Sequence, residues 1–506
     1  MNTIFRKSHL FYRQVRNQVY MFRSPPLFLR NAYIRNTHVE TSNNEQPNNI
    51  DSNNQISKNV LNQKHIKEFC LTHDAGLEHL VEFTIPDETT IIDHNAFENC
   101  KSLKFVTLTN NITTIGNDAF AGCKDLTSFK MPNSITHLGE GSFSSCSSLE
   151  AITISNGISQ IHHGTFWHCK SLRFIDIPYG VTTIQNRAFK GCKSLNKVLF
   201  PNSLNSISEG AFWDCSALTT INIPQSVQSL GTRCFYECKS LSYVNLPSNL
   251  SYISDSTFYK CHSLESIDIP KTVSEIGKSA FAECKSLTDV SIPKNVHTIG
   301  ELAFNLCSSI NRIDLPEKLN KINNASFQLC TSLTHVSFNE NLNVIGSAAF
   351  RKCANLNNIT IPNGVTTLSD DAFSGCSALD DITIPNSVIE IGKSTFANCD
   401  ALKKITIPED VPEIAISTFR DCASLTEITL PDSLTKIAYR AFMGCKSLKA
   451  INIPKNVTFI GKDAFKGCHA LRQVFCENKK IFNASQFDDI DNIEFISYES
   501  INHRHQ

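Results

Sequence analysis

A cysteine recurs every 23 residues along most of this chain, with no insertion or deletion between copies. The series contains seventeen cysteines, from Cys100 to Cys468, and a phenylalanine stands three residues before each one, from Phe97 to Phe465. A leucine follows three residues after each cysteine, except at Ile310. This strict period predicts an array of stacked repeats that grows along one axis, rather than several globular domains.

One repeat, Cys284 to Phe304 (CKSLTDVSIPKNVHTIGELAF), shows the pattern of the unit. Val290 and Ile292 alternate with polar neighbours, which is the period of a half-buried strand. Pro293 lacks a backbone donor, so the strand is expected to end there. Thirteen full repeats have a proline at this position.

The second half of the unit predicts a turn region. A second apolar pair, Val296 and Ile299, leads to Gly300, where we expect a φ angle that residues with a Cβ resist. The alanine and Phe304 should then turn inward on a short helical turn ending at Cys307. A single unit cannot bury these side chains alone, so the prediction is a repeat solenoid, mainly a parallel strand ladder with short helical turns.

The cysteine column has two interpretations. A small apolar residue suits a tight inward turn, which predicts buried and reduced thiols. The alternative is a ladder of disulfides between neighbouring repeats, but their Cβ vectors would run parallel, and an odd number of cysteines leaves one thiol over.

The pattern FxxCxSLxxIxIPxxVxxIGxxAF resembles the BspA-like (Treponema-type) class of leucine-rich repeats, known from bacterial surface proteins and parasitic protists. The resemblance covers residues 77–477. It implies a right-handed solenoid and a binding or adhesion role, with no catalytic residues to carry over. Because the family keeps cysteine in cell-surface proteins, the cysteines do not assign a compartment.

The two ends differ from the repeats. Residues 1–40 are basic, with no acidic residue before position 40, and their apolar residues share one helical face. Such a segment predicts a targeting sequence, a membrane-surface helix or an unstructured basic tail. Residues 41–76 read as an Asn/Gln/Ser-rich linker and lead-in. Residues 478–506 read as a C-terminal cap and tail, with a last strand within 493–498.

Net charge and hydropathy limit the classes of function that the sequence allows. A net charge of −1 gives no overall attraction to nucleic acid, and we expect no nucleic-acid partner. No run of 18 apolar residues and no secretory signal core is present, so membrane contact is expected only through residues 1–40. A cytoplasmic protein is the default, and surface display, secretion or organelle targeting stay open.

The outward positions of the first strand, two and four residues after the repeat leucine, should form one continuous face. Exposed aromatic residues and arginine are common anchors of protein interfaces, and the alternative is ordinary strand propensity. This face predicts the partner-binding candidates Phe105, Phe174, Leu199, Tyr243 and Arg312.

A second candidate surface lies two residues before the repeat cysteine. Successive repeats there place Trp167, Trp213, Tyr236 and Tyr259, with Lys190 between the tryptophans. We will call these five residues the aromatic column. Such a stripe could bind a peptide or a carbohydrate ring, and the alternative is packing between adjacent turns.

Catalytic and metal-binding signals are weak. His162, His163 and His168 crowd one repeat without an accessible fourth ligand, and the column from Thr360 to Thr429 is better explained by cross-strand pairing. No nucleotide-binding, hydrolase or metalloprotease motif is present. We therefore expect no enzyme activity, cofactor or metal. The expected function is protein binding by a scaffold, with a surface adhesin and a structural spacer as alternatives.

Overall fold

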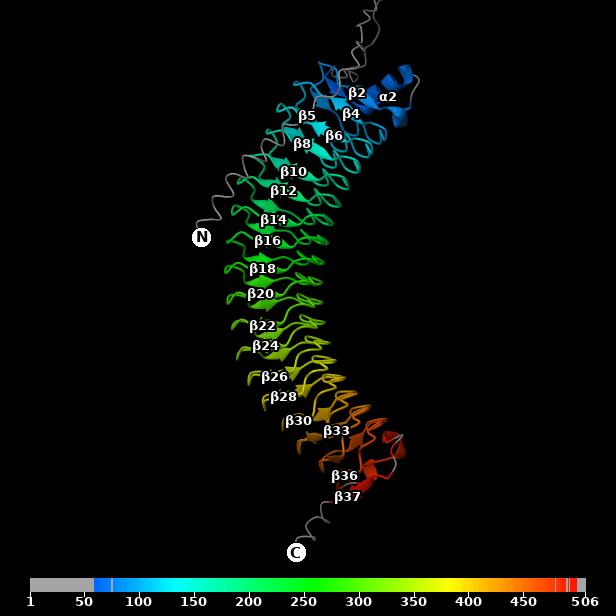
Figure 1. The fold of residues 1–506 in the computed structure, drawn as a ribbon, viewed down its shortest axis with the longest axis vertical. Coiled ribbons are helices and arrows are strands. Elements are labelled where there is room, and N and C mark those ends of the chain that lie inside the picture. The colour runs from blue at the N-terminus through cyan, green and yellow to red at the C-terminus, as the bar shows by residue number, and fades with distance from the viewer. Residues whose placement is uncertain (1–58, 74–75, 478, 488–489, 491, 498–506) are drawn as a thin grey trace, which may run out of the picture. The chain divides into compact units, whose positions relative to one another are not determined.

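The computed structural model describes residues 59–73, 76–477, 479–487, 490 and 492–497. This part of the chain is a parallel β-solenoid in which strands of successive repeats lie side by side (Figure 1). The basic segment predicted at residues 1–40 lies outside the described residues, as does the linker up to residue 58. Among the described helices, none is long and apolar enough to cross a membrane.

The first ladder is formed by the strand that the sequence predicts before the proline. Each strand has three residues, and in β20 the side chain of Val290 is buried between exposed Asp289 and Ser291. Strands pair in parallel with a 23-residue offset, mostly two at a time. The strands are β2 (Glu82–Thr84), β4 (Phe105–Thr107), β6 (Ser128–Lys130), β8 (Ala151–Thr153), β10 (Phe174–Asp176), β12 (Lys197–Leu199), β14 (Thr220–Asn222), β16 (Tyr243–Asn245), β18 (Ser266–Asp268), β20 (Asp289–Ser291), β22 (Arg312–Asp314), β24 (His335–Ser337), β26 (Asn358–Thr360), β28 (Asp381–Thr383), β30 (Lys404–Thr406), β32 (Glu427–Thr429), β34 (Ala450–Asn452), β36 (Gln473–Phe475) and β37 (Glu494–Ile496).

A second ladder, which the sequence did not predict as strands, runs through the apolar pair before the glycine position. Its strands have two residues each and pair in parallel sheets of three or four. They are β1 (Val60–Leu61), β3 (Ile91–Ile92), β5 (Thr114–Ile115), β7 (His137–Leu138), β9 (Gln160–Ile161), β11 (Thr183–Ile184), β13 (Ser206–Ile207), β15 (Ser229–Leu230), β17 (Tyr252–Ile253), β19 (Glu275–Ile276), β21 (Thr298–Ile299), β23 (Lys321–Ile322), β25 (Val344–Ile345), β27 (Thr367–Leu368), β29 (Glu390–Ile391), β31 (Glu413–Ile414), β33 (Lys436–Ile437) and β35 (Phe459–Ile460).

The expected helical turn is a run of single turns rather than continuous helix. The N–H of Cys307 donates to the carbonyl three residues earlier, at 3.2 Å, while Leu302 and Leu306 adopt a left-handed φ of 58°. The same two positions have positive φ in all seventeen repeats. Their N–H groups point to the next repeat, so Leu302 and Leu306 donate to Asn324 and Gln328 at 3.0 and 2.8 Å. These inter-repeat bonds offset the strain of the left-handed residues.

The turn needs glycine at position 300 for a different reason from the one expected from the sequence. Gly300 does not adopt a positive φ, contrary to our expectation. A Cβ built on Gly300 would instead lie 2.5 Å from the backbone nitrogen of Lys278 in the preceding repeat. Close approach of two repeats therefore requires the glycine.

A stack of phenylalanine rings fills the core along the solenoid. The rings from Phe97 to Phe465, and then Phe487, follow one another at centroid distances of 5.0–5.9 Å with interplanar angles of 2–17°. The seventeen repeat phenylalanines are fully buried. The rings therefore couple each repeat to both neighbours through offset stacking and area burial.

All twenty cysteines are buried and none forms a disulfide, as the first interpretation of the cysteine column predicts. No disulfide ladder is present. Burial raises the pKa of the Cys146 and Cys330 thiols to about 12, so these groups stay protonated at neutral pH. The thiols are therefore part of the packed interior.

The N-terminal cap begins earlier than the sequence indicated. We expected a linker up to residue 76 and the solenoid from residue 77, but β1 pairs with β3, and the helix α2 (Gln63–Thr72) follows it. Phe69 of α2 packs edge-on against Phe83 at 5.0 Å, and Phe83 packs edge-on against Phe97 at 5.2 Å. Phe83 thus lies between the helix and Phe97, the first ring of the stack, and Figure 1 shows α2 at this end of the solenoid. A short 3₁₀ turn, η1 (Leu77–His79), connects the helix to β2.

The C-terminal end closes in a similar way. Two 3₁₀ turns, η2 (Lys479–Ile481) and η3 (Ala484–Gln486), precede β37, which pairs with β36. The ring of Phe487 stacks on Phe465 at 5.2 Å, and the buried amide of Gln486 donates to the carbonyl of Ile460 at 2.9 Å. The last strand lies within the predicted range 493–498.

Candidate functional site

The outward positions of the first ladder form the strand face that the sequence predicted. Phe105 and Tyr243 are 54% and 50% exposed, while Phe174 and Leu199 are half-buried. Phe105, Phe174 and Tyr243 follow one another at intervals of three repeats, which corresponds to roughly 15 Å between successive residues at ordinary strand spacing. The structure therefore gives three separate aromatic positions on one face, and no continuous aromatic patch.

The ring of Tyr243 is exposed on the strand face. In the pairing of β14 with β16, Thr220 lies beside Tyr243, and Ser266 occupies the same position in the following repeat. Among the described residues no other ring packs against Tyr243. Two residues further along the same pair of strands, the side-chain amide of Asn245 donates to that of Asn222 at 2.5 Å. The ring therefore stands between small polar neighbours.

The charged end of the strand face is partly neutralised. Arg312 is exposed, but its guanidinium donates to the carboxylate of Asp314 at 2.9 and 3.1 Å. The bond to Arg312 lowers the pKa of Asp314. Arg312 is thus available to a partner only as one half of an ion pair.

The structure brings the aromatic column together. The ammonium of Lys190 lies 3.6 Å from the Trp213 ring centroid and 5.8 Å from that of Trp167. Tyr236 packs on Trp213 at 4.8 Å, and Tyr259 stacks on Tyr236 at 4.7 Å and 18°. Neighbouring side chains thus cover the ring faces of Trp213 and Tyr236. The arrangement favours packing between turns over stacking against a sugar ring.

Polar contacts fix the end of the aromatic column. The Tyr259 hydroxyl donates to Glu283 at 3.0 Å, and burial together with this bond raises the pKa of Tyr259. Lys260 lies over the Tyr259 ring and bonds to Glu237 at 3.4 Å. These partners hold the phenol ring in place.

The crowded histidines do not converge. Burial lowers the pKa of His162, whose ring lies 5.6 Å from that of His137, and His168 packs edge-on against Trp167. In the described part of the chain, no three His, Cys, Asp or Glu side chains are placed to hold a metal ion. The column that begins at Thr360 pairs across strands as predicted, with Thr360 opposite Thr383.

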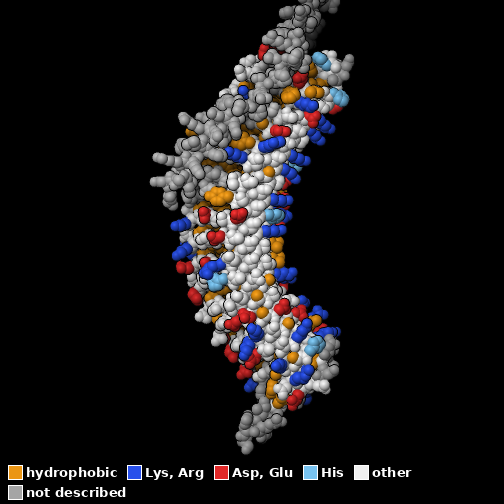
Figure 2. Space-filling view, in the orientation of Figure 1, with side chains coloured by type: hydrophobic (Ala, Val, Ile, Leu, Met, Phe, Trp, Pro, Cys, Tyr) orange, Lys and Arg blue, Asp and Glu red, His pale blue; other side chains and the backbone are white. Residues whose placement is uncertain are grey.

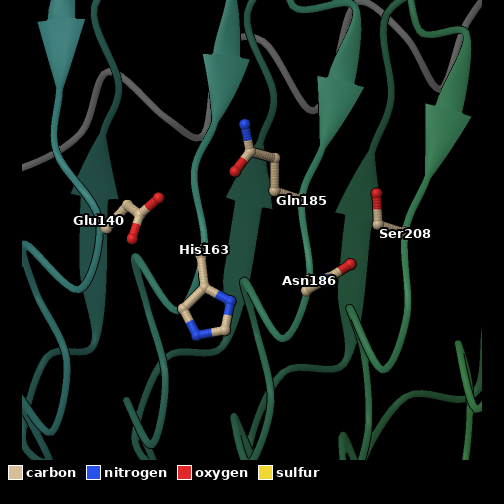
Figure 3. Close-up of a pocket in the computed structure, with 5 residues that line it drawn as sticks. All are labelled: Glu140, His163, Gln185, Asn186 and Ser208. Carbon is tan, nitrogen blue, oxygen red and sulfur yellow. The ribbon is translucent and has the colours of Figure 1, made fainter.

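An open hollow lies near these histidines, in the repeats where Gln185 and Ser208 occupy the position that Gly300 has in its own repeat. Its lining is Glu140, His163, Gln185, Asn186 and Ser208. Figure 3 shows these side chains in a row along successive turns instead of pointing at one centre. None of the five is fully buried. The hollow therefore lacks the enclosed, desolvated setting in which acids and bases act as catalysts.

One exposed column was not singled out from the sequence. The residue directly after the repeat cysteine is lysine in many of the N-terminal repeats. The sequence does contain the pattern, because these lysines recur at multiples of 23 residues. We missed it because lysine in a turn is usual on any protein surface.

The sequence model of a family described as "BspA type Leucine rich repeat region (6 copies)" matches residues 64–184, 159–285, 251–380 and 371–496. No curated protein matches the chain.

Several solved structures of leucine-rich repeat proteins are similar to this chain. A leucine-rich repeat protein from Bacteroides ovatus is 27% identical, with a TM-score of 0.58, and the match covers 82% of this chain and 92% of that one. A leucine-rich cell surface protein from Faecalibacterium prausnitzii is 27% identical over 69% of this chain and 87% of its own, with a TM-score of 0.40. A leucine-rich repeat protein of T. pallidum is 27% identical over 36% and 77%, with a TM-score of 0.27.

Proposed function

Because the chain belongs to the BspA-type leucine-rich repeat family, we propose that it is a non-enzymatic scaffold that binds another protein through its strand face. The part of the strand face proposed to bind consists of the outward residues of β4 to β22. The fold alone supports only a general binding role, since one fold hosts many functions. The residues that depart from the repeat pattern support the more specific proposal.

The observation that carries the proposal is the exposure of Tyr243 on a rigid ladder. Its ring is half exposed, has no aromatic neighbour among the described residues and lies next to small or amide side chains. Tyrosine gives a large contact area at a small cost in conformational entropy, and amides around it supply adaptable hydrogen bonds. Tyr243 is therefore the proposed central anchor.

Phe105, Phe174 and Leu199 are proposed as secondary anchors along the same face. Phe174 and Lys197 lie opposite each other in the ladder, as do Asp176 and Leu199, so each apolar side chain has a charged neighbour. A partner would bury the apolar groups at intervals set by the repeat. Arg312, already paired with Asp314, is proposed to act at the rim.

Affinity capture from the native cell tests the strand face. The full chain and the double variant Phe174→Ala/Tyr243→Ala are compared by quantitative mass spectrometry. We expect the partner's recovery to fall about tenfold or more, as for loss of anchors at the centre of an interface. The matched control is Tyr179→Ala, because Tyr179 is 80% exposed but lies outside the strand face. Equal recovery with both variants would contradict the proposal.

The compartment is a separate question, because buried thiols without disulfides do not depend on a reducing environment for their packing. We propose cytoplasmic residence, with surface display as the alternative that would make the chain an adhesin. Protease treatment of intact cells distinguishes the two. A protected chain supports cytoplasmic residence, and cleavage from outside contradicts it.

A further inference from the structure

We propose that the solenoid has a second binding surface, for a linear anionic polysaccharide, along the lysines that directly follow the repeat cysteines. We call this surface the lysine row. It does not depend on the strand face or on the proposed protein partner. Its members occupy the same exposed position in repeats of the N-terminal half and are Lys101, Lys124, Lys170, Lys193, Lys239 and Lys285.

Backbone hydrogen bonds keep the row positions of successive repeats in register. The N–H one residue further along donates to the carbonyl of the row position in the preceding repeat, as Ser194 does to Lys170 at 3.0 Å. The same bond joins Ser286 to His262 at 3.1 Å. Row positions are therefore spaced by one repeat, and at a strand spacing of about 4.8 Å the row extends over roughly 40 Å.

Most of the charge in the lysine row is not neutralised within the chain. Within the described residues, only Lys193 of the row has a carboxylate within 4 Å of its ammonium, that of Asp214 at 3.3 Å. The next acids along the edge, Glu237 and Glu283, contact Lys260 and the Tyr259 hydroxyl instead. Asp125 is an exposed acid beside the row.

The lysines at the row position are concentrated in the N-terminal half of the solenoid, and one further copy, Lys446, stands near the C-terminal end. In six repeats beyond Lys285, the row position holds no basic residue. Figure 2 shows Lys and Arg side chains following one another along one edge of that same half. Anions would therefore be attracted locally even though the chain's net charge is −1. The six later residues are Ser308, Thr331, Ala354, Ser377, Asp400 and Ala423.

The surroundings of the row favour a polysaccharide over other anionic polymers. An acidic peptide that binds as an added strand needs free backbone groups, but those of the row already bond between repeats. Single-stranded nucleic acid binds through stacking on open ring faces, and neighbours cover those of Trp213 and Tyr236. Ammonium groups and half-buried serine hydroxyls such as Ser171 and Ser194 remain. These are donors for sulfate and carboxylate groups spaced along a linear chain.

Heparin is the probe, and binding to the full-length protein is measured by calorimetry. The test variant replaces four row lysines by glutamine: Lys124→Gln, Lys170→Gln, Lys239→Gln and Lys285→Gln. The control variant makes the same change in net charge at exposed lysines of other columns: Lys271→Gln, Lys294→Gln, Lys455→Gln and Lys462→Gln. We expect the row variant to raise Kd by at least about tenfold and the control by less than about twofold. Binding should vanish near 1 M salt, where the Debye length is about 3 Å.

Several outcomes would contradict the proposal that the lysine row binds a polysaccharide. Equal losses in the two variants would mean non-specific charge attraction, and no loss in either would place heparin elsewhere. Tighter binding of polyglutamate, polyuridine or phosphatidylserine vesicles than of heparin would refute the polysaccharide class. An unchanged thermal unfolding midpoint verifies that both variants are folded. Tyr243→Ala should leave heparin affinity unchanged, so the outcome is separate from that of the strand face.

Discussion

The Sγ atom of Cys284 lies 3.2 Å from the carbonyl oxygen of Phe258, which belongs to the preceding repeat. The sixteen repeat cysteines from Cys123 to Cys468 all make this bond, at 3.0–3.4 Å. Each thiol is therefore a donor that links two repeats as well as a small side chain that fits the turn. Valine or alanine could supply the size but not the bond.

Replacing Cys284 by alanine should lower the free energy of unfolding by about 1–3 kcal/mol, because both a hydrogen bond and buried volume are lost. Urea unfolding followed by circular dichroism measures the change. Cys234→Ala is the matched control, since Cys234 is equally buried but occupies the position of Ala211 and Ala280 in other repeats. Equal effects of the two substitutions would show that the thiol bond contributes nothing.

Removing one ring from the phenylalanine stack should be more costly. Phe281→Ala should lower the free energy of unfolding by about 3–5 kcal/mol, because the ring is fully buried between two others. Phe105→Ala, on the exposed strand face, should change it by less than about 0.5 kcal/mol. The same urea titration measures both. A small effect at Phe281 would contradict the stacked core.

The sequence predicted the repeat unit, its first strand and the burial of the phenylalanines and cysteines, because each is marked at every 23rd residue. It did not predict the second ladder, since two-residue strands such as β21 carry too few positions for an alternating pattern. It also assigned Gly300 to the wrong cause. The close contact of Gly300 with Lys278 joins two repeats, so it cannot be predicted from the pattern of residues within one repeat.

The N-terminal cap was missed for a similar reason. Its apolar residues are few and lie beside an Asn-rich stretch, so composition outweighed the helical spacing of Ile66, Phe69 and Cys70. Among the candidate residues, sequence placed the aromatic column in one line. Only the structure shows that its ring faces are covered by neighbours.

Disrupting the cap should loosen only the first repeats. Ile66→Ser places a hydroxyl at a fully buried position of α2, which should unfold the helix locally and expose Phe83. Hydrogen exchange followed by mass spectrometry should show faster exchange at residues 82–107 and unchanged exchange beyond residue 200. Lys67→Ser, at an exposed position of the same helix, is the control. Faster exchange throughout the chain would contradict local capping.

Acid should destabilise the repeat around His162. Burial, together with nearby His137, lowers the pKa of His162 below its unfolded value of about 6.5. Below that pH the unfolded chain binds the proton more readily, so this stability is present above about pH 6.5 and is lost as the pH falls. Urea midpoints at two pH values should therefore differ less in His162→Gln than in the unmodified chain. His469→Gln, at an exposed position, should behave like the unmodified chain.

Photo-crosslinking in the native cell tests the proposed protein-binding role most directly. A photoreactive phenylalanine analogue replaces Tyr243 in one variant and Tyr179 in another, and adducts are identified by mass spectrometry. Binding through the strand face predicts a specific adduct with another protein from position 243 and none from position 179. The opposite pattern, or the same adducts from both positions, would contradict it.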